Sequence, residues 1–313
     1  MNVLSLFDGI SCGMIALERA GIKVDKYFSS EIDDDAIKVS EKNYPNIIRL
    51  GDVTKVHSKN LPKIDLLIGG SPCQGFSRAG KCLNFNDPRS ALFFEYVRLL
   101  KEIRIINPDV KFLLENVRMK KEWKDVITDY LEVEPNEINS KIISAQNRER
   151  VYWTNINYKE ITQTDPRLES ILESVDTSNY IKTNELLFDP AIPESQRELV
   201  SMVNGEVRIR QATKLGYIVP NDYDGVNLCF PKSTSRRGRV IRYKSNCITC
   251  MGRVAIYYKN TFRYLTITEV ERLQTLPDGY TEGVSDTARY KVCGNGWTVD
   301  VVANILKGLK EVT

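Results

Sequence analysis

The stretch from residue 64 to residue 77 constrains this chain more than any other part of its sequence. An apolar run ending in Leu66-Leu67-Ile68 stops abruptly at Gly69-Gly70, and Ser71-Pro72-Cys73-Gln74 follows. Such a run is typical of a strand buried in a parallel sheet, and ligands bind outside the carboxyl ends of those strands. Cys73 is therefore a candidate nucleophile. The alternative is a packed, inert thiol, for which a Gly- and Pro-rich loop is a poor setting.

The composition is that of a globular protein. The chain has 313 residues, of which 42% are hydrophobic and 27% charged, enough for two domains or for one large α/β domain with an insertion. It has no apolar run of about 18 residues and no basic N-terminal region, so we expect neither a membrane span nor a signal peptide. Seven cysteines without framework spacing indicate reduced thiols and a cytoplasmic location.

Histidine chemistry is nearly excluded by the composition. His57 is the only histidine, and its neighbours are typical of a surface loop. A multi-histidine metal site is therefore impossible, and we interpret His57 as incidental, because solvated histidines far outnumber catalytic ones.

The N-terminal segment has the pattern of a nucleotide-binding unit. Residues 3–7 predict a strand, residues 8–13 a turn with two glycines, and residues 14–20 an amphipathic helix. Backbone amides of such a turn and the helix N-terminus face a ligand. Taken alone, the glycines are equally compatible with a simple tight turn.

Acidic residues follow the next two predicted strands. Glu31 ends the strand at 27–31, where a carboxylate binds ribose hydroxyls. Asp33 already offers a cap for the following helix, which favours the ribose role for Glu31. A third strand is predicted at 47–53 and carries Asp52, a candidate acceptor for an adenine amino group. The chain has no Gly-x-x-x-x-Gly-Lys-[Ser/Thr] motif, so we expect an adenosine-type ligand without phosphates, such as S-adenosylmethionine.

A second carboxylate is predicted close to Cys73. A helix is expected over residues 88–106, followed by a strand that opens at 111–114 and finishes at Glu115-Asn116-Val117. This places Glu115 at the end of the strand beside that of Cys73. A salt-bridged surface acid is the ordinary explanation, but a carboxyl group at a buried strand mouth is a candidate proton donor.

Arg148 and Arg150 are two residues apart in an unusual polar string. On an extended backbone both side chains point to one face. A surface charge pair is one explanation, and an anion or substrate clamp is the other.

Ordered motifs across nearly the whole chain resemble those of the cytosine-carbon-5 DNA methyltransferases. The N-terminal part of the match consists of Phe7-Asp8-Gly9, Glu31, Gly51-Asp52-Val53, Ser71-Pro72-Cys73-Gln74, Glu115-Asn116-Val117 and Gln146-x-Arg148-x-Arg150. The C-terminal part consists of the stretch from Arg263 to Glu269 with Leu273, Gln274 and Pro277, and of Gly294-Asn295-Gly296-Trp297-Thr298-Val299.

The resemblance implies an α/β fold with a doubly wound, mostly parallel, Rossmann-like methyltransferase sheet and a smaller target-recognition domain. It divides the chain into a catalytic, S-adenosylmethionine-binding domain at 1–156, a target-recognition domain at 157–262 and a C-terminal segment at 263–313 that returns to the catalytic domain. We expect a monomer that acts on double-stranded DNA and has no metal.

The implied reaction transfers a methyl group from S-adenosylmethionine to carbon 5 of a cytosine flipped out of a specific DNA sequence. Cys73 would add to carbon 6, and Glu115 would protonate or hydrogen-bond ring nitrogen 3. Arg148 and Arg150 would hold the cytosine and the catalytic loop. The residues expected to bind the cofactor are Phe7, Asp8, Gly9, Ile10, Cys12, Glu31, Ile32, Asp52, Val53, Pro72, Asn295 and Trp297.

A basic stretch supports a nucleic-acid partner. Residues 225–268 contain nine lysines and arginines and no acidic residue, so the net charge of +3 hides a local positive patch. A solvated charge run is the alternative. The residues expected to contact DNA are Gln74, Ser77, Arg236, Arg237, Arg239, Arg242 and Lys244.

Two alternatives to an active DNA methyltransferase are considered, and one cysteine pair needs a separate interpretation. A tRNA cytosine-carbon-5 methyltransferase has the same scaffold and catalytic motifs. A catalytically inactive DNA-binding relative would lack Cys73, Glu115 or part of the donor site, and none of these is missing. Cys247-Ile248-Thr249-Cys250 has metal-ligand spacing, but with no second pair we interpret it as structural.

Overall fold

The main sheet of the protein has the doubly wound order that the sequence predicts. The computed structural model describes residues 1–72, 88–174, 181–182, 194, 198–250 and 254–312. The sheet order is β3-β2-β1-β4-β5-β8-β6, in which β1 to β5 are parallel, β8 is antiparallel to β5, and β6 is antiparallel to β8. The strands are β1 (Asn2–Leu6), β2 (Lys26–Ser30), β3 (Ile48–Arg49), β4 (Leu66–Gly69), β5 (Lys111–Val117), β6 (Asn136–Asn139) and β8 (Glu149–Thr154).

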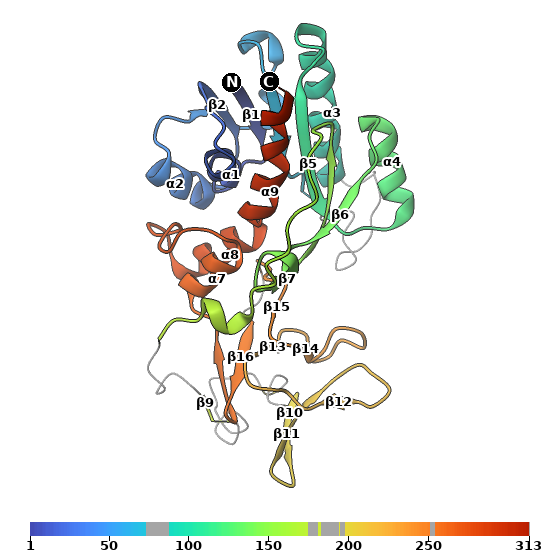
Figure 1. Cartoon of the computed structure of the whole chain (residues 1–313), viewed down its shortest axis with the longest axis vertical. Helices are drawn as coiled ribbons and strands as arrows, with labels where there is room; N and C mark the ends of the chain where they lie inside the picture. Colours follow the sequence, from blue (N-terminus) through green and yellow to red (C-terminus); the bar gives the residue numbers. More distant parts are fainter. Residues whose placement is uncertain (73–87, 175–180, 183–193, 195–197, 251–253, 313) are drawn as a thin grey trace.

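Helices cover both faces of this sheet (Figure 1). On one face, α1 (Cys12–Ala20), α2 (Asp34–Asn43) and α9 (Val299–Leu306) pack against β1 and β4 through one hydrophobic core. On the other face, α3 (Pro88–Ile106) and α4 (Lys121–Leu131) bury their apolar sides in a second core. The central strands are apolar on both sides because both faces are covered.

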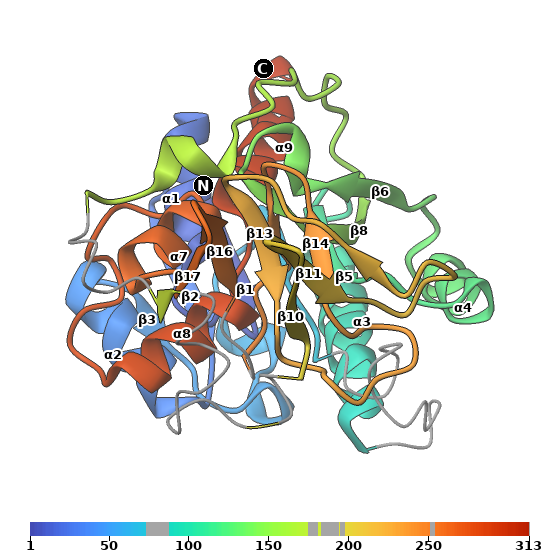
Figure 2. The ribbon, with the colours of Figure 1, turned by 90° about the horizontal axis from the view of Figure 1, so that it is seen from below.

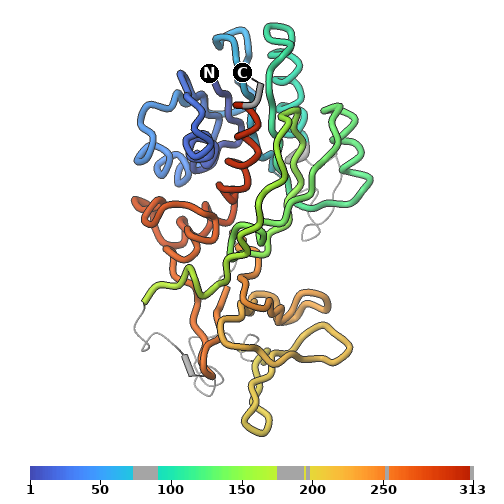
Figure 3. Tube along the Cα trace, viewed as in Figure 1, coloured from blue at the N-terminus to red at the C-terminus, as the bar shows by residue number. Residues whose placement is uncertain are grey.

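The C-terminal segment completes the first layer. Helix α9 lies beside α1 although nearly the whole chain separates them, and both termini lie at the same end of the molecule (Figure 3). Helices α7 (Ile267–Leu273) and α8 (Asp286–Asn295) precede α9 and lie near α2. A segment from the far end of the sequence is thereby brought beside the N-terminal helix α1.

A smaller β-rich lobe lies below the main sheet in Figure 1 and has its own apolar core. Its two sheets have the orders β14-β13-β16-β17-β9 and β10-β11-β12. The strands are β9 (Ile181–Lys182), β10 (Val200–Val203), β11 (Glu206–Arg210), β12 (Tyr217–Ile218), β13 (Asp224–Asn227), β14 (Arg239–Ile241), β16 (Ala255–Tyr258) and β17 (Thr261–Tyr264). Figure 2, seen from below, shows these strands in front of the main sheet.

A two-stranded parallel ladder joins the small lobe to the catalytic part. Strand β15 (Ser245–Asn246) pairs with β7 (Gln146–Asn147). The predicted boundary after residue 262 falls inside β17, and the three-part division of the chain stays a prediction.

One detail of the predicted sheet is wrong. The third strand covers only Ile48–Arg49 instead of 47–53, because Asp52 caps a 3-10 helix at Val53–Lys55. The predicted strand that finishes at Glu115-Asn116-Val117 is confirmed, since β5 covers Lys111–Val117 and pairs with β8. The predicted cap of α2 is confirmed, since the Asp33 side chain accepts hydrogen bonds from Asp35 and Ala36.

No helix within the described part of the chain combines the length and apolar character needed to cross a membrane.

A buried ion pair holds the junction between the small lobe and α7. Arg263 on β17 makes hydrogen bonds of 2.6 and 2.7 Å to the two carboxylate oxygens of Glu269, and the two side chains are 3% and 0% exposed. Removing one partner of such a pair leaves the other charge buried without compensation.

We predict that Arg263→Met lowers the free energy of unfolding by about 3–5 kcal/mol. The matched control is Arg118→Met, which removes an exposed pair with Glu149 and should cost less than about 1 kcal/mol. Urea unfolding of both variants checks this. Equal losses in the two variants would contradict the assigned role.

Candidate active site

The site lies where the order of the parallel strands reverses, between β1 and β4. Leu6 and Gly69 are in register at the carboxyl ends of these strands. In doubly wound sheets this switch point opens the crevice in which ligands bind. The turn after β1, the Gly69–Gly70 pair at the end of β4 and the end of β5 all meet there.

The turn after β1 has a strained backbone and a buried carboxylate. Phe7, Gly9 and Ser11 have left-handed φ angles of 56°, 58° and 60°, a conformation that is costly for non-glycine residues. The Asp8 side chain points inward and accepts hydrogen bonds from Ser5, Ser11 and Tyr27 at 2.5–2.7 Å. Burial raises the pKa of Asp8. The hydrogen bonds to Asp8 therefore stabilise the conformation of this turn.

Glu31 joins this turn to the end of β2. Its Oε2 accepts from Gly9 N at 2.8 Å, and its Oε1 accepts from the backbone N of Ile32 and of Asp33 at 2.8 Å each. Beside it, the side chain of Ile32 is 72% exposed, which is unusual for isoleucine. A carboxylate and an open apolar surface thus lie side by side at this edge.

Asp52 lies after β3, at the start of the 3-10 helix Val53–Lys55. Its Oδ1 accepts from Thr54 N at 2.9 Å and from Thr54 Oγ1 at 2.8 Å, and the backbone bond lowers the pKa of Asp52. Val53 is buried. The hydroxyl of Ser30 donates to Gly51 O at 2.7 Å and ties this loop to β2.

The remaining predicted cofactor residues differ in exposure. Ile10 and Cys12 are buried, and burial raises the pKa of the Cys12 thiol to about 12. Asn295 is exposed, whereas Trp297 is 9% exposed. Pro72 is partly buried and is the last described residue of its loop.

Gly70 lies between Trp297, which is predicted to bind the cofactor, and Glu115, the predicted proton donor. A Cβ built on Gly70 would lie 2.9 Å from Trp297 Nε1 and 3.2 Å from Glu115 Oε2. A side chain at this position would force these two groups to shift, which favours glycine directly after β4. The side chain of Asn116 then fixes the next residue by donating to Ser71 Oγ at 3.1 Å. Cys73, Gln74 and Ser77 lie outside the described residues.

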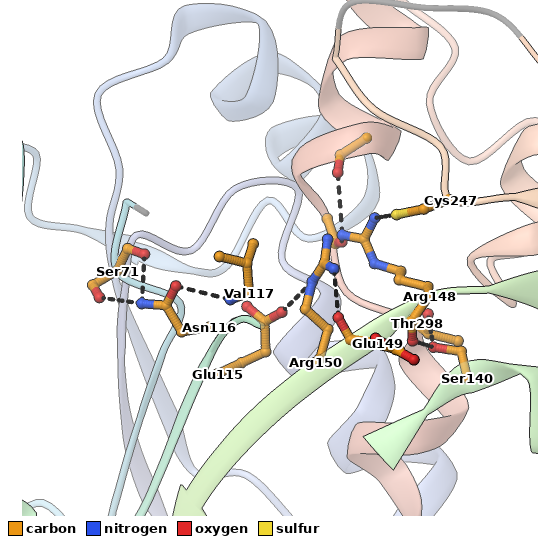
Figure 4. A network of polar contacts seen from close by, with 12 residues as sticks. Ser71, Glu115, Asn116, Val117, Ser140, Arg148, Glu149, Arg150, Cys247 and Thr298 are labelled. Atoms are coloured by element: carbon orange, nitrogen blue, oxygen red, sulfur yellow. Dashed lines mark hydrogen bonds and ion pairs between the residues drawn. The ribbon is translucent and has the colours of Figure 1, made fainter. Parts of the chain in front are cut away.

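Arg150 forms an ion pair with Glu115 at the centre of the site. Its Nε lies 2.8 Å from Glu115 Oε1, and the side chains are 13% and 10% exposed. Figure 4 shows Arg150 between Glu115 and Arg148. The two arginines are neighbours in space, but their partners differ, and the predicted substrate clamp stays a prediction.

Arg148 is fully enclosed and bound to backbone carbonyls. Its Nη1 donates to Ile248 O at 3.2 Å, and its Nη2 donates to Gly294 O at 3.1 Å and Gly296 O at 2.7 Å. The residue is 2% exposed. This geometry favours a positioning role over direct contact with a substrate.

Cys247 lies against the same guanidinium group (Figure 4). Arg148 Nη1 is 3.5 Å from Cys247 Sγ. Burial alone would raise the pKa of Cys247, but the charges of Arg148 and Arg150 outweigh it, so that the pKa is lowered. Within the described residues no group of three or more His, Cys, Asp or Glu side chains could hold a metal ion.

Two buried glutamines, for which the sequence predicts no chemical role, extend this polar cluster. Gln146 donates from Nε2 to Leu273 O at 3.2 Å and accepts from Ile248 N at 2.9 Å. Gln274 donates to Gly296 O at 3.0 Å. Both side chains are 0% exposed. The sequence signal that could have identified both glutamines is their position as uncharged polar residues within the matched motifs.

The basic residues predicted to contact DNA fall into two groups. Arg239 is exposed, and Arg236 stacks on the ring of Phe230 with 4.4 Å between guanidinium carbon and ring centroid; Arg237 lies next to Arg236 and is partly buried. Arg242, by contrast, pairs with the fully buried carboxylate of Asp224.

Lys244 is also engaged inside the protein. Its Nζ donates to the carbonyls of Lys141, Ser144 and Pro166 and lies 2.9 Å from Asp165 Oδ1. The geometry favours a bracing role for Lys244 over a phosphate contact, because the ammonium group has only three N–H donors.

The chain belongs to the C-5 cytosine-specific DNA methylase family, which it matches over residues 1–311. It is 32% identical to the Type II methyltransferase M1.ScrFI of Lactococcus lactis subsp. cremoris, over 99% of this chain and 78% of that protein. It is 30% identical to the Type II methyltransferase M.FnuDI of Fusobacterium nucleatum, over 99% of this chain and 94% of the relative. The crystal structure of the S. pombe Dnmt2 methyltransferase has the same fold, with a TM-score of 0.68, 20% identity and coverage of 100% and 99%.

The guanidinium groups beside Cys247 should make its thiol more reactive than that of Cys12. We predict that iodoacetamide modifies Cys247 at neutral pH faster than Cys12, whose pKa is raised to about 12, because only the thiolate is nucleophilic. Because Arg148 stabilises the Cys247 thiolate, the pH of half-maximal rate at Cys247 should rise in Arg148→Met. Peptide mass spectrometry over a pH series measures both rates. An unchanged pH profile in the variant would contradict the assignment.

Proposed function

We propose that the protein methylates carbon 5 of a cytosine flipped out of a specific double-stranded DNA sequence, with S-adenosylmethionine as donor and Cys73 as nucleophile. The observation that carries the proposal is the meeting of Trp297, Gly70 and Glu115 within 3.2 Å of one point, three residues before Cys73. The proximity of Trp297 and Glu115 supports a site in which the methyl donor and the proposed proton donor act on the same base.

The residues at the switch point suit the proposed donor. Gly9 and Gly51 have φ angles of 58° and 71°, and a Cβ on either would meet no atom within 4 Å, so open space lies above both turns. Glu31 offers a carboxylate for ribose hydroxyls, and the exposed side chain of Ile32 offers an apolar surface for a base. When bound, the donor supplies an electrophilic methyl group on its sulfonium.

The chain's own residues would prepare the cytosine. The Cys73 thiolate adds to carbon 6, which makes carbon 5 nucleophilic, and it leaves again after carbon 5 has been methylated and has lost its proton. Glu115 interacts with ring nitrogen 3 and stabilises the charge that addition creates. Arg150 fixes the Glu115 carboxylate by the 2.8 Å contact at Oε1, which leaves Oε2 directed toward Gly70.

The DNA would lie between the catalytic part and the small lobe. Arg236, Arg237 and Arg239 belong to the connection between β13 and β14 and its end, which extends on the α4 side of the molecule in Figures 1 and 2. Positive charge on this connection supports binding to phosphates. The Type II relatives support a role in modification beside a restriction endonuclease.

We predict that Cys73→Ser abolishes methyl transfer but leaves binding of S-adenosylhomocysteine within about threefold of wild type, because a serine hydroxyl is far less nucleophilic than a thiolate. Transfer of tritiated methyl groups to unmethylated plasmid DNA and isothermal titration calorimetry are the two measurements. Normal turnover by the variant would exclude the mechanism. Turnover by the wild type on tRNA, but not on DNA, would favour the tRNA alternative.

The exposed arginine on β14 gives a second prediction. Arg239→Ala should reduce the salt dependence of DNA binding, with the slope of log K against log salt smaller by about 0.9 for one lost phosphate contact. Arg118→Ala removes an arginine from an exposed pair on the catalytic part and serves as the control. Fluorescence anisotropy on duplex DNA at several salt concentrations measures the slope. An identical slope in Arg239→Ala and wild type would contradict a phosphate contact by Arg239.

A further inference from the structure

Two segments from different parts of the fold meet at Arg148. The recognition segment, residues 245–250, contains β15 and leads into the strands of the small lobe. The cofactor-side segment, residues 293–298, contains the end of α8 and Trp297. We propose that Arg148 is a positioning residue that couples occupancy of the cofactor site to the orientation of the recognition segment. The inference rests on the proposed function for the identity of the cofactor site.

The first connection is the guanidinium group itself. Nη1 binds Ile248 O in the recognition segment, while Nη2 binds Gly294 O and Gly296 O in the cofactor-side segment. A planar guanidinium holds its donors at fixed angles, so the two sets of carbonyls cannot move independently without breaking a hydrogen bond. Because Arg148 is 2% exposed, water cannot readily replace a lost partner, and each break is costly.

The buried glutamines provide a parallel connection. Ile248 N donates to Gln146 Oε1, and Gln146 Nε2 lies 3.3 Å from Gln274 Oε1. Gln274 Nε2 in turn donates to Cys293 O at 2.6 Å and to Gly296 O at 3.0 Å. The backbone of the recognition segment is thus tied to the same carbonyl of Gly296 by two independent routes.

Direct backbone contact makes the third connection. A Cβ built on Gly294 would lie 2.5 Å from Cys250 N and 2.5 Å from the carbonyl carbon of Thr249. Both neighbours are backbone atoms, which cannot rotate away as a side chain can. The two segments are therefore packed so closely that a shift of one must displace the other.

The cluster around Arg148 is also connected to the residues proposed to act in the reaction. Arg148 and Arg150 are two residues apart on one edge of the sheet, and Arg150 holds Glu115. On the other side, Trp297 follows Gly296 directly and lies beside Gly70. A ligand that orders the cofactor-side segment would therefore stabilise one arrangement of recognition segment and Glu115. By linkage, DNA that orders the recognition segment would strengthen cofactor binding by the same factor.

Hydrogen exchange with S-adenosylhomocysteine as probe tests the coupling without any DNA. In the wild-type protein we expect saturating S-adenosylhomocysteine to slow amide exchange in residues 293–298 and, at least about fivefold, in residues 245–250. In Arg148→Met the protection of 293–298 should remain and that of 245–250 should be lost. Arg118→Met, which removes an exposed arginine, should behave as wild type.

A second variant perturbs the contact without removing charge. Gly294→Ala places a methyl group against Cys250 N and Thr249, and it should uncouple the segments in the same way as Arg148→Met. This variant decides the question if Arg148→Met loses its cooperative thermal transition.

The outcomes separate the inference from the proposed function. Undiminished protection of residues 245–250 in the folded variants would overturn the coupling role of Arg148. So would a wild-type protein that binds S-adenosylhomocysteine in calorimetry and protects only residues 293–298, and in that case the cofactor assignment would stand. No calorimetric binding by the wild type would refute the cofactor site and the inference together.

Discussion

The absence of space at Gly70 is the constraint on which the site depends. Strand β4 must end between Trp297 and Glu115, and any Cβ at residue 70 would overlap the indole nitrogen at 2.9 Å. Three distant parts of the chain meet at this point: the loop after β4, the strand β5, and the segment that returns from the C-terminus. In the proposed reaction the methyl donor, Glu115 and Cys73 act on the same cytosine, and the close approach of Trp297 and Glu115 suits such a transfer between two bound molecules.

The two arginines of one motif have different roles: Arg150 contacts the proposed proton donor, and Arg148 holds parts of the backbone together. Arg150 pairs with Glu115 and orients it, whereas Arg148 donates hydrogen bonds to the carbonyls of Ile248, Gly294 and Gly296. Arg150 lies in β8 and Arg148 directly precedes that strand, and the packing around each decides what it contacts. Methylation of a flipped base requires that recognition and catalysis be in register, and the cluster around Arg148 is where the two parts of the fold are joined.

Local patterns were sufficient for most of the sheet and for the family. The apolar runs at β1, β4 and β5 identify buried strands, and the order of motifs identifies the family. Contacts between distant segments were beyond reach: nothing near Lys244 in the sequence indicates that its ammonium group binds the carbonyls of Lys141, Ser144 and Pro166. The third strand was predicted too long because its apolar residues continue to Val53, while the cap formed by Asp52 ends the extended backbone.

The central claim is covalent addition of Cys73 to cytosine, and trapping on DNA that carries 5-fluorocytosine tests it most directly. Fluorine at carbon 5 cannot be removed as a proton is, so the enzyme should stay attached to the base after methyl transfer. Incubation with S-adenosylmethionine, digestion and mass spectrometry should then identify one modified peptide, linked through Cys73. A protein that methylates ordinary DNA but forms no adduct, or forms it at another cysteine, would contradict the account.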